Sequence, residues 1–181
     1  GPPEDVNTSG APALEPTIAP LGGSDVAVFW SDTRDGAYEL YYRARRQGAW
    51  MPEVRLTDLD GSSRYPAAAP DGSGGLHLAW LYTPPASNPR VYYAHLGPGI
   101  PVLAPISLTP DTARPDAPSL APSPDGSCYV LWPERVTQPT RLWVVPIHPV
   151  TGAGTRRRLT PTDGTTQSSA APVVVRNGIL H

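Results

Sequence analysis

The sequence predicts an all-β fold: a β-propeller of four-stranded antiparallel blades, of which about three and a half are present. Three observations lead to this prediction. The chain repeats itself with a period near 51 residues, which is typical of propellers and other repeat architectures. Each repeat divides into four short apolar runs, the size of one blade, whereas a β-sandwich needs about seven strands over roughly 100 residues. The second run of each repeat is apolar without alternation, as expected where neighbouring blades cover both faces of a sheet.

Three landmarks define the repeat. A tryptophan follows a proline by 14 residues in each unit, at positions 16 and 30, 66 and 80, and 118 and 132. A quartet rich in aromatic and apolar residues recurs at 39–42, 90–93 and 141–144, and a Leu-Thr pair at 56–57, 108–109 and 159–160. Because the landmarks keep the same spacing, the units are copies of one supersecondary element.

Each unit divides into strands A to D. We predict an N-terminal segment at 1–15, blades at 16–65, 66–117 and 118–171, and the start of a fourth blade at 172–181. The predicted strands are 16–20, 24–31, 37–45 and 53–57, then 66–70, 75–82, 90–96 and 102–109, then 118–122, 127–133, 141–147 and 155–160. Asp-Gly at 71–72 and 125–126 and Asn-Gly at 177–178 mark tight turns between A and B.

Three and a half blades do not close a ring, since propellers typically have about four to eight. Residues 4–8 hold the place of a preceding strand D and could complete a shared blade with a partner. We therefore expect either self-association into a dimer or larger assembly, or covalent continuation of the chain into further blades.

Composition fits a chain of short strands. Its 25 prolines and 17 glycines lie between the apolar runs, so they separate strands and do not indicate disorder. The formal net charge of −2 gives no attraction to nucleic acid. No apolar stretch reaches the ~18 residues of a membrane span, so we expect neither a nucleic-acid partner nor membrane insertion. The single Cys128 lies in an apolar run and is expected to be a small buried residue.

The first unit resembles the repeat of sialidase-like propellers of the BNR or Asp-box type. The resemblance runs through 30–36, 39–43, 48–50 and 55–57 and fades in the other units. The Asp-box of that family, Ser-x-Asp-x-Gly-x-Thr-Trp, would fall near 44–50, where only Gly48 and Trp50 match. No Arg-Ile-Pro element and no arginine triad is found. The resemblance therefore implies the fold without the catalytic pattern, and no catalytic residue is predicted.

One face of the propeller is the candidate functional surface. In an up-and-down blade the B–C and D–A loops share one end of the sheet, and here these loops carry most of the loop charge. Asp32 and Glu134 both sit two residues after a repeat tryptophan, so we interpret them as structural. Four residues have no such counterparts in every unit and are binding candidates: Arg34, Asp60, Arg64 and Tyr65. The other candidates are charged residues of the same loops: Asp35, Arg114, Asp116 and Arg135. The alternative is that long loops simply carry solvated charge.

Other motifs favour simpler interpretations. Asp58 to Gly61 offer too few oxygens for a Ca²⁺ loop, and the four histidines lack metal-ligand spacing, so we predict no metal and no cofactor. Residues 156–158, all arginine, fall in the predicted outer strand of blade three, where charge blocks edge-to-edge aggregation. An anion site is the alternative for these arginines.

Three functions remain open from the sequence. The first is a non-catalytic recognition module for carbohydrate or protein, within a secreted or cell-surface bacterial protein. The second is a fragment of a sialidase-like glycoside hydrolase, with Asp35, Asp60 or Glu134 as acid or nucleophile and Arg34 or Arg64 on a substrate carboxylate. The third is a structural segment of a larger repeat protein.

Overall fold

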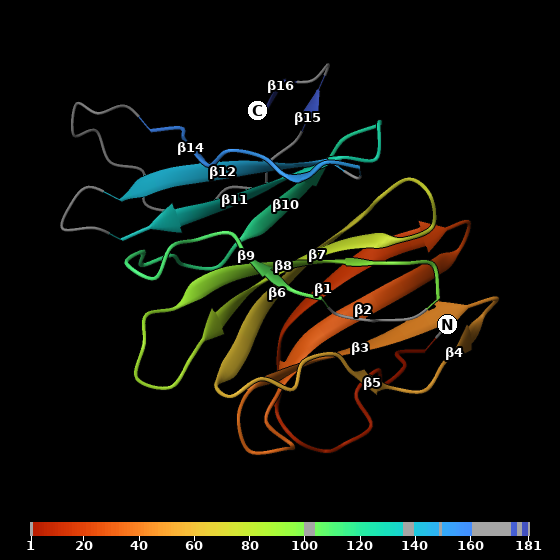
Figure 1. The fold of residues 1–181 in the computed structure, drawn as a ribbon. Helices are drawn as coiled ribbons and strands as arrows, with labels where there is room; N and C mark the ends of the chain where they lie inside the picture. Colours follow the sequence, from red (N-terminus) through yellow and green to blue (C-terminus); the bar gives the residue numbers. More distant parts are fainter. Residues whose placement is uncertain are drawn as a thin grey trace.

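The computed structural model describes residues 2–99, 104–135, 140–148 and 150–160, together with the backbone of 175–176 and 179–180. It is built from antiparallel sheets, and none of the described residues is helical. The sheets follow one another along the chain (Figure 1). None of the described segments has the helical length and apolarity that a membrane span requires.

The first sheet has the order β1-β2-β3-β4, and β5 also pairs with β3. Its strands are β1 (Ala13–Gly22), β2 (Asp25–Asp32), β3 (Glu39–Arg46), β4 (Ala49–Trp50) and β5 (Val54–Arg55). The second sheet has the order β6-β7-β8-β9, formed by β6 (Ser62–Pro70), β7 (Leu76–Thr83), β8 (Arg90–Leu96) and β9 (Ile106–Ser107).

The third sheet repeats the pattern of the first. Its order is β10-β11-β12-β13, and β14 also pairs with β12. The strands are β10 (Ser119–Pro122), β11 (Cys128–Glu134), β12 (Arg141–His148), β13 (Gly152–Ala153) and β14 (Arg157–Arg158). A separate pair, β15 (Val175–Arg176) and β16 (Ile179–Leu180), is antiparallel.

Strands A and D differ from the predicted ranges. Strand D is two short pieces in the first and third sheets, β4 with β5 and β13 with β14. In the second sheet the described residues of strand D form β9 alone. The predicted strand 102–109 begins in residues outside the described ones. Strand A begins earlier than predicted, at residue 13 in β1 and residue 62 in β6.

A β-bulge in strand A, which we call the inner strand, explains this early start. In the first sheet the pairing passes from Leu14 with Ser31 to Thr17 with Phe29, so two residues, 15 and 16, oppose Trp30. The second sheet has the same shift between residues 64 and 67, opposite Trp80. A bulge breaks the hydrogen-bond ladder, and proline, which has no N–H, is tolerated at such a break. In the first two sheets the proline and tryptophan landmark of the repeat is therefore the bulge and the residue facing it.

The Leu-Thr landmark joins the outer strand to strand C. In the first sheet the Leu56 amide donates to the Leu40 carbonyl at 2.7 Å, and the Leu40 amide donates to Thr57 Oγ1 at 2.8 Å. The same two bonds recur in the second sheet at 2.8 and 3.1 Å and in the third at 2.9 and 3.4 Å. One leucine and one threonine thus satisfy the backbone of strand C in all three sheets.

The core lies between the sheets. One cluster joins Phe29 and Leu40 of the first sheet to Leu78 and Trp80 of the second. A second cluster joins Ala79 of the second sheet to residues of the third that include Cys128, Val130 and Trp132. Alternate residues of β7 therefore serve different cores, which explains why this strand is apolar without alternation. The expected burial of Cys128 is confirmed.

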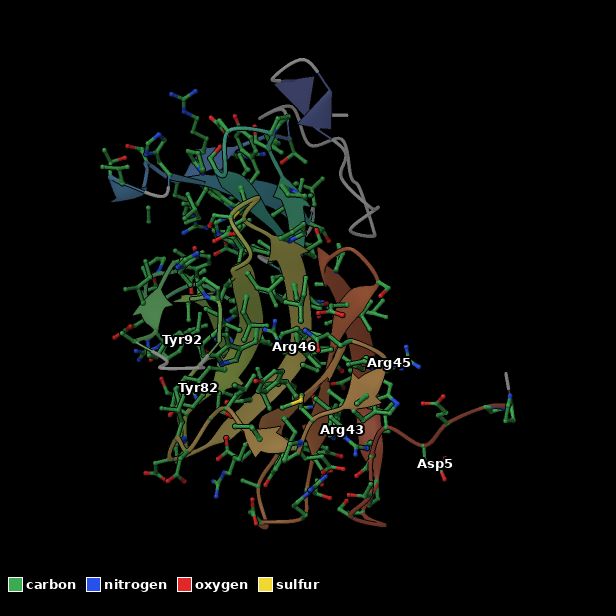
Figure 2. The ribbon with its side chains drawn as sticks, turned by 90° about the vertical axis from the view of Figure 1, so that its right-hand side faces the viewer. Asp5, Arg43, Arg45, Arg46, Tyr82 and Tyr92 are labelled. Carbon is green, nitrogen blue, oxygen red and sulfur yellow. The ribbon has the colours of Figure 1, made fainter. Side chains whose placement is uncertain are left out.

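Residues 4–9 cover part of the first sheet and form no strand. Phe29 and Tyr42 face the second sheet, so Arg43 and Arg45 project from the opposite, outward face. Here the Trp50 indole donates to Glu4 at 2.6 Å, and Arg43 donates to the Val6 carbonyl at 3.2 Å. Figure 2 shows Asp5 and Arg45 on the same side of the sheet. We call residues 4–9 the N-terminal strap. Whether they complete a blade with a partner stays a prediction.

Candidate binding site at the inner ends of the first two sheets

Two bulge residues aim their side chains at one place. Glu15 and Tyr65 each precede the repeat proline, and each has a left-handed backbone, with φ of 57° and 55°. Among the described non-glycine residues only two others have a positive φ. Bulges redirect side chains next to functional sites, and left-handed non-glycine residues concentrate there as well. With Ser31, Tyr38 and Arg64 these two residues form what we call the inner-strand cluster.

The Glu15 carboxylate is the centre of the inner-strand cluster. It accepts hydrogen bonds from Ser31 Oγ at 2.8 Å and from the Tyr65 amide at 2.9 Å. It also forms an ion pair with Arg64 Nη2, and Arg64 Nε lies 3.4 Å from its second oxygen. The Glu15 side chain is 15% exposed and the Arg64 side chain 32%. The pair is therefore open enough to meet a ligand on one side.

Two tyrosine rings flank the Arg64 guanidinium. Its central carbon lies 4.3 Å from the ring centre of Tyr38 and 4.9 Å from that of Tyr65. Tyr38 ends the B–C loop of the first sheet, and its carbonyl accepts from the Ser63 amide at 2.7 Å. Burial favours the neutral form of Arg64, but the hydrogen bond and charge of Glu15 outweigh it and raise the Arg64 pKa. The cluster thus presents a permanent cation between two aromatic surfaces.

The sequence and the structure were each compared with known proteins. No family description and no curated protein matches the sequence. Among solved structures, the chain is similar to the subtype N10 neuraminidase-like protein of A/little yellow-shouldered bat/Guatemala/060/2010. The TM-score is 0.58 at 13% identity, over 84% of this chain and 46% of that one. The chain has the β-propeller fold of the sialidases.

The intramolecular trans-sialidase from Ruminococcus gnavus, solved in complex with oseltamivir carboxylate, is a second similar structure. Its TM-score is 0.49 at 18% identity, over 71% of this chain and 29% of that one. The chain spans less than half the length of either protein. The predicted fold class, a partial β-propeller of several antiparallel blades, and the resemblance to sialidase-like propellers are confirmed. We refer to the first, second and third sheets as the first, second and third blades.

Of the eight predicted binding residues, Arg64 and Tyr65 lie in the inner-strand cluster. Sequence reasoning missed Glu15, Ser31 and Tyr38. A signal for Glu15 existed, because it precedes its repeat proline as Tyr65 does.

Arg34 and Asp35 belong to a separate network in the first blade. Arg34 donates to Asp32 at 2.6 Å, to Glu53 at 2.7 Å and to Asn7 of the N-terminal strap at 2.8 Å. Burial would raise the Asp32 pKa, but the hydrogen bonds from Arg34 and Trp30 outweigh it and lower that pKa. Asp35 accepts from the Tyr41 hydroxyl and lies 3.3 Å from Arg55. These contacts hold the B–C loop on its own blade.

The remaining predicted residues lie elsewhere on the propeller. Asp116 pairs with Arg135 at 2.7 Å, and Arg135 is 78% exposed. Arg114 is exposed and its carbonyl accepts from the Arg135 amide at 2.9 Å. Asp60 contributes a backbone carbonyl to the Tyr82 hydroxyl at 2.6 Å. None of them contacts the inner-strand cluster through a bond among the described residues.

The outer arginine run needs a correction. The Arg156 side chain is not an exposed edge charge: it pairs with the buried Glu134 and lies 3.7 Å from the ring centre of Trp143. Strand β14 begins one residue later, at Arg157.

Two cavities in the described region are lined by residues outside the inner-strand cluster. One of about 260 Å³ is lined by residues 56–59, Trp80 and Pro105, and one of about 210 Å³ by residues of the A–B turns of the first two blades. Within the described ranges no three His, Cys, Asp or Glu side chains are grouped as a metal ion requires.

Proposed function

We propose that this chain is a recognition module that binds carbohydrate through the inner-strand cluster. The observation that carries the proposal is the Arg64 guanidinium, partly exposed and flanked by Tyr38 and Tyr65. Aromatic rings pack against the C–H faces of sugars, while guanidinium donors and carboxylate acceptors pair with hydroxyl groups. Both kinds of contact meet here, on the loop face of a rigid scaffold.

A glycan array with the purified protein tests the proposal. We expect binding to at least one glycan, and about tenfold or greater loss of affinity in Arg64→Ala, because the substitution removes both the stacked cation and its hydrogen bonds. The matched control is Arg135→Ala, which removes an exposed arginine outside the cluster and should leave affinity within about twofold.

Other outcomes of the array separate the alternatives. Equal losses in the two variants would mean that the inner-strand cluster is not the site. Absence of glycan binding, with capture of a protein from the native source, would favour protein recognition. Turnover of a glycoside by the pure protein would favour the hydrolase alternative, which requires two carboxyl groups facing one sugar. For that reaction Glu134 would have to leave Arg156, and Asp35 would have to leave Tyr41 and Arg55.

A further inference from the structure

We infer that the inner-strand cluster selects neutral sugars and rejects carboxylated ones; the inference rests on the proposed function. Its first basis is the occupied edge of Arg64. Carboxylates bind arginine best through two parallel N–H groups on one edge of the guanidinium. In this cluster Nη2 is paired with Glu15, and Nε lies 3.4 Å from the same carboxylate. An internal carboxylate therefore already holds one of the two edges through which Arg64 could pair with a ligand carboxylate, and only the Nη1–Nη2 edge is left.

The second basis is that Glu15 is fixed. Ser31 Oγ and the Tyr65 amide donate to one of its oxygens at 2.8 and 2.9 Å, and Ser31 is fully buried. The left-handed backbone of Glu15 sits in a bulge that the pairing on both sides maintains. A ligand carboxylate would thus meet a fixed negative charge, and like charges held close together repel.

The third basis is the set of groups in the cluster that are free to contact a ligand. As far as the structure describes the cluster, Arg64 is its sole cation, and no described residue accepts a hydrogen bond from its Nη1. The two N–H donors of Nη1 and the two tyrosine rings are left for a ligand, and these suit hydroxyl groups and a sugar face. Among the described residues of the cluster no second guanidinium balances the charge of an added carboxylate.

The experiment compares each neutral glycan with its sialylated form, such as lactose with 3′-sialyllactose, on one array and by titration calorimetry. The wild type should bind a neutral member at least about tenfold more tightly than its sialylated partner. Glu15→Gln keeps the side-chain size and an acceptor for Ser31 but removes the charge, so it should raise binding of the sialylated member and narrow the ratio about tenfold. The matched control is Glu53→Gln, which removes another arginine-paired carboxylate of the first blade and should leave the ratio unchanged.

Three results overturn the inference. They are tighter wild-type binding of the sialylated members, a ratio that Glu15→Gln does not change, and equal changes in Glu15→Gln and Glu53→Gln. If the wild type binds no glycan and Glu15→Gln gains 3′-sialyllactose, the proposed function fails but the charge inference holds. If Glu15→Gln also binds nothing while melting like the wild type, both fail.

Discussion

At the scale of single residues, His77 joins the second blade to the third. Its ring is fully buried, with Nδ1 2.7 Å from the Tyr93 hydroxyl and Nε2 3.1 Å from the Gly126 carbonyl oxygen. A carbonyl oxygen can only accept, so Nε2 donates to it, and in the neutral ring Nδ1 accepts from the Tyr93 hydroxyl. Burial favours this neutral ring over the charged imidazolium.

This arrangement predicts a loss of stability in acid. Burial lowers the His77 pKa below its usual value near 6.5. The unfolded chain then binds a proton that the native state excludes, so the free energy of unfolding falls as pH drops below about 6.5, by at most about 1.4 kcal/mol per pH unit. Burial would raise the pKa of nearby Asp71, but hydrogen bonds from Ser73, His95 and Gly75 outweigh it and lower that pKa to about 2, so this carboxyl stays ionised over the same interval.

Urea unfolding of the wild type and of His77→Gln between pH 7 and pH 5 measures this effect. The variant should be less stable at pH 7 but change less with pH. His95→Gln is the matched control, because His95 is partly exposed and bonds to Asp71 at 2.8 Å. The same pH slope in the wild type and His77→Gln would contradict the prediction.

At the scale of the blade, the repeat threonine accepts a hydrogen bond from a backbone amide of strand C in each sheet, but the strength of this contact differs between blades. Thr57 accepts from the Leu40 amide at 2.8 Å and also donates to the buried Glu39 carboxylate. Thr160 accepts from the Leu142 amide at 3.4 Å and from Arg158 Nε at 3.2 Å. Both threonines are buried. The two positions allow one substitution to be compared in two blades.

Thr57→Val should therefore cost more than Thr160→Val. The first leaves the Leu40 N–H without an acceptor and removes one donor from the buried Glu39 carboxylate, which keeps its ion pair with Arg55. This should lower the free energy of unfolding by about 2–3 kcal/mol, and the second substitution by about 1 kcal/mol or less. Denaturant midpoints of the two variants give the comparison. Equal losses would mean that the shorter hydrogen bond of Thr57 and its bond to Glu39 do not stabilise the first blade more than Thr160 stabilises the third.

The sequence was enough to predict where the strands lie, but not where a strand carries a bulge or which way Arg156 packs. Apolar runs between glycines and prolines predicted nearly every strand of the three sheets, since burial on both faces leaves a strong local pattern. The bulge at Glu15 depends on the register against Trp30, which is set across the sheet and not by neighbours in sequence. Arg156 was misplaced for a similar reason, because Trp132 and Trp143, distant in sequence, provide the surfaces against which it packs.

At the scale of the whole molecule, the three blades form an arc with an open outward face. Ile18 is 62% exposed on this face, whereas its counterparts in the next two blades, Ala68 and Leu120, pack into the cores between sheets. The N-terminal strap covers the outer part of the face, near Trp50, and leaves Ile18 uncovered. Exposed apolar surface of this kind favours association.

We expect this chain to associate in solution through that face. Light scattering at micromolar concentration should give a mass above 19.2 kDa. Ile18→Lys should shift the mass towards the monomer, because a charge cannot be buried against an apolar partner. Val150→Lys is the control, since Val150 is 85% exposed in a turn of the third blade. A monomeric wild type with a cooperative melt would show that the arc is stable alone.

The outward face of the first blade carries cross-strand residues that differ from those of the other two blades, and they determine how this face contacts the N-terminal strap. Opposite Val28 and Val26, the first blade carries Arg43 and Arg45. At these positions the second blade has Ala94 and Leu96, and the third has Val145 and Ile147, all buried in the cores between blades. The interfaces between neighbouring blades of this chain are thus hydrophobic, and salt hardly weakens them. The joint at the first blade is made in part by ion pairing and hydrogen bonding with an acidic strap, and screening by salt loosens contacts of this kind. The same fold therefore contains two kinds of interface. Raising the ionic strength should weaken the contact between the N-terminal strap and the first blade but not the interfaces between blades.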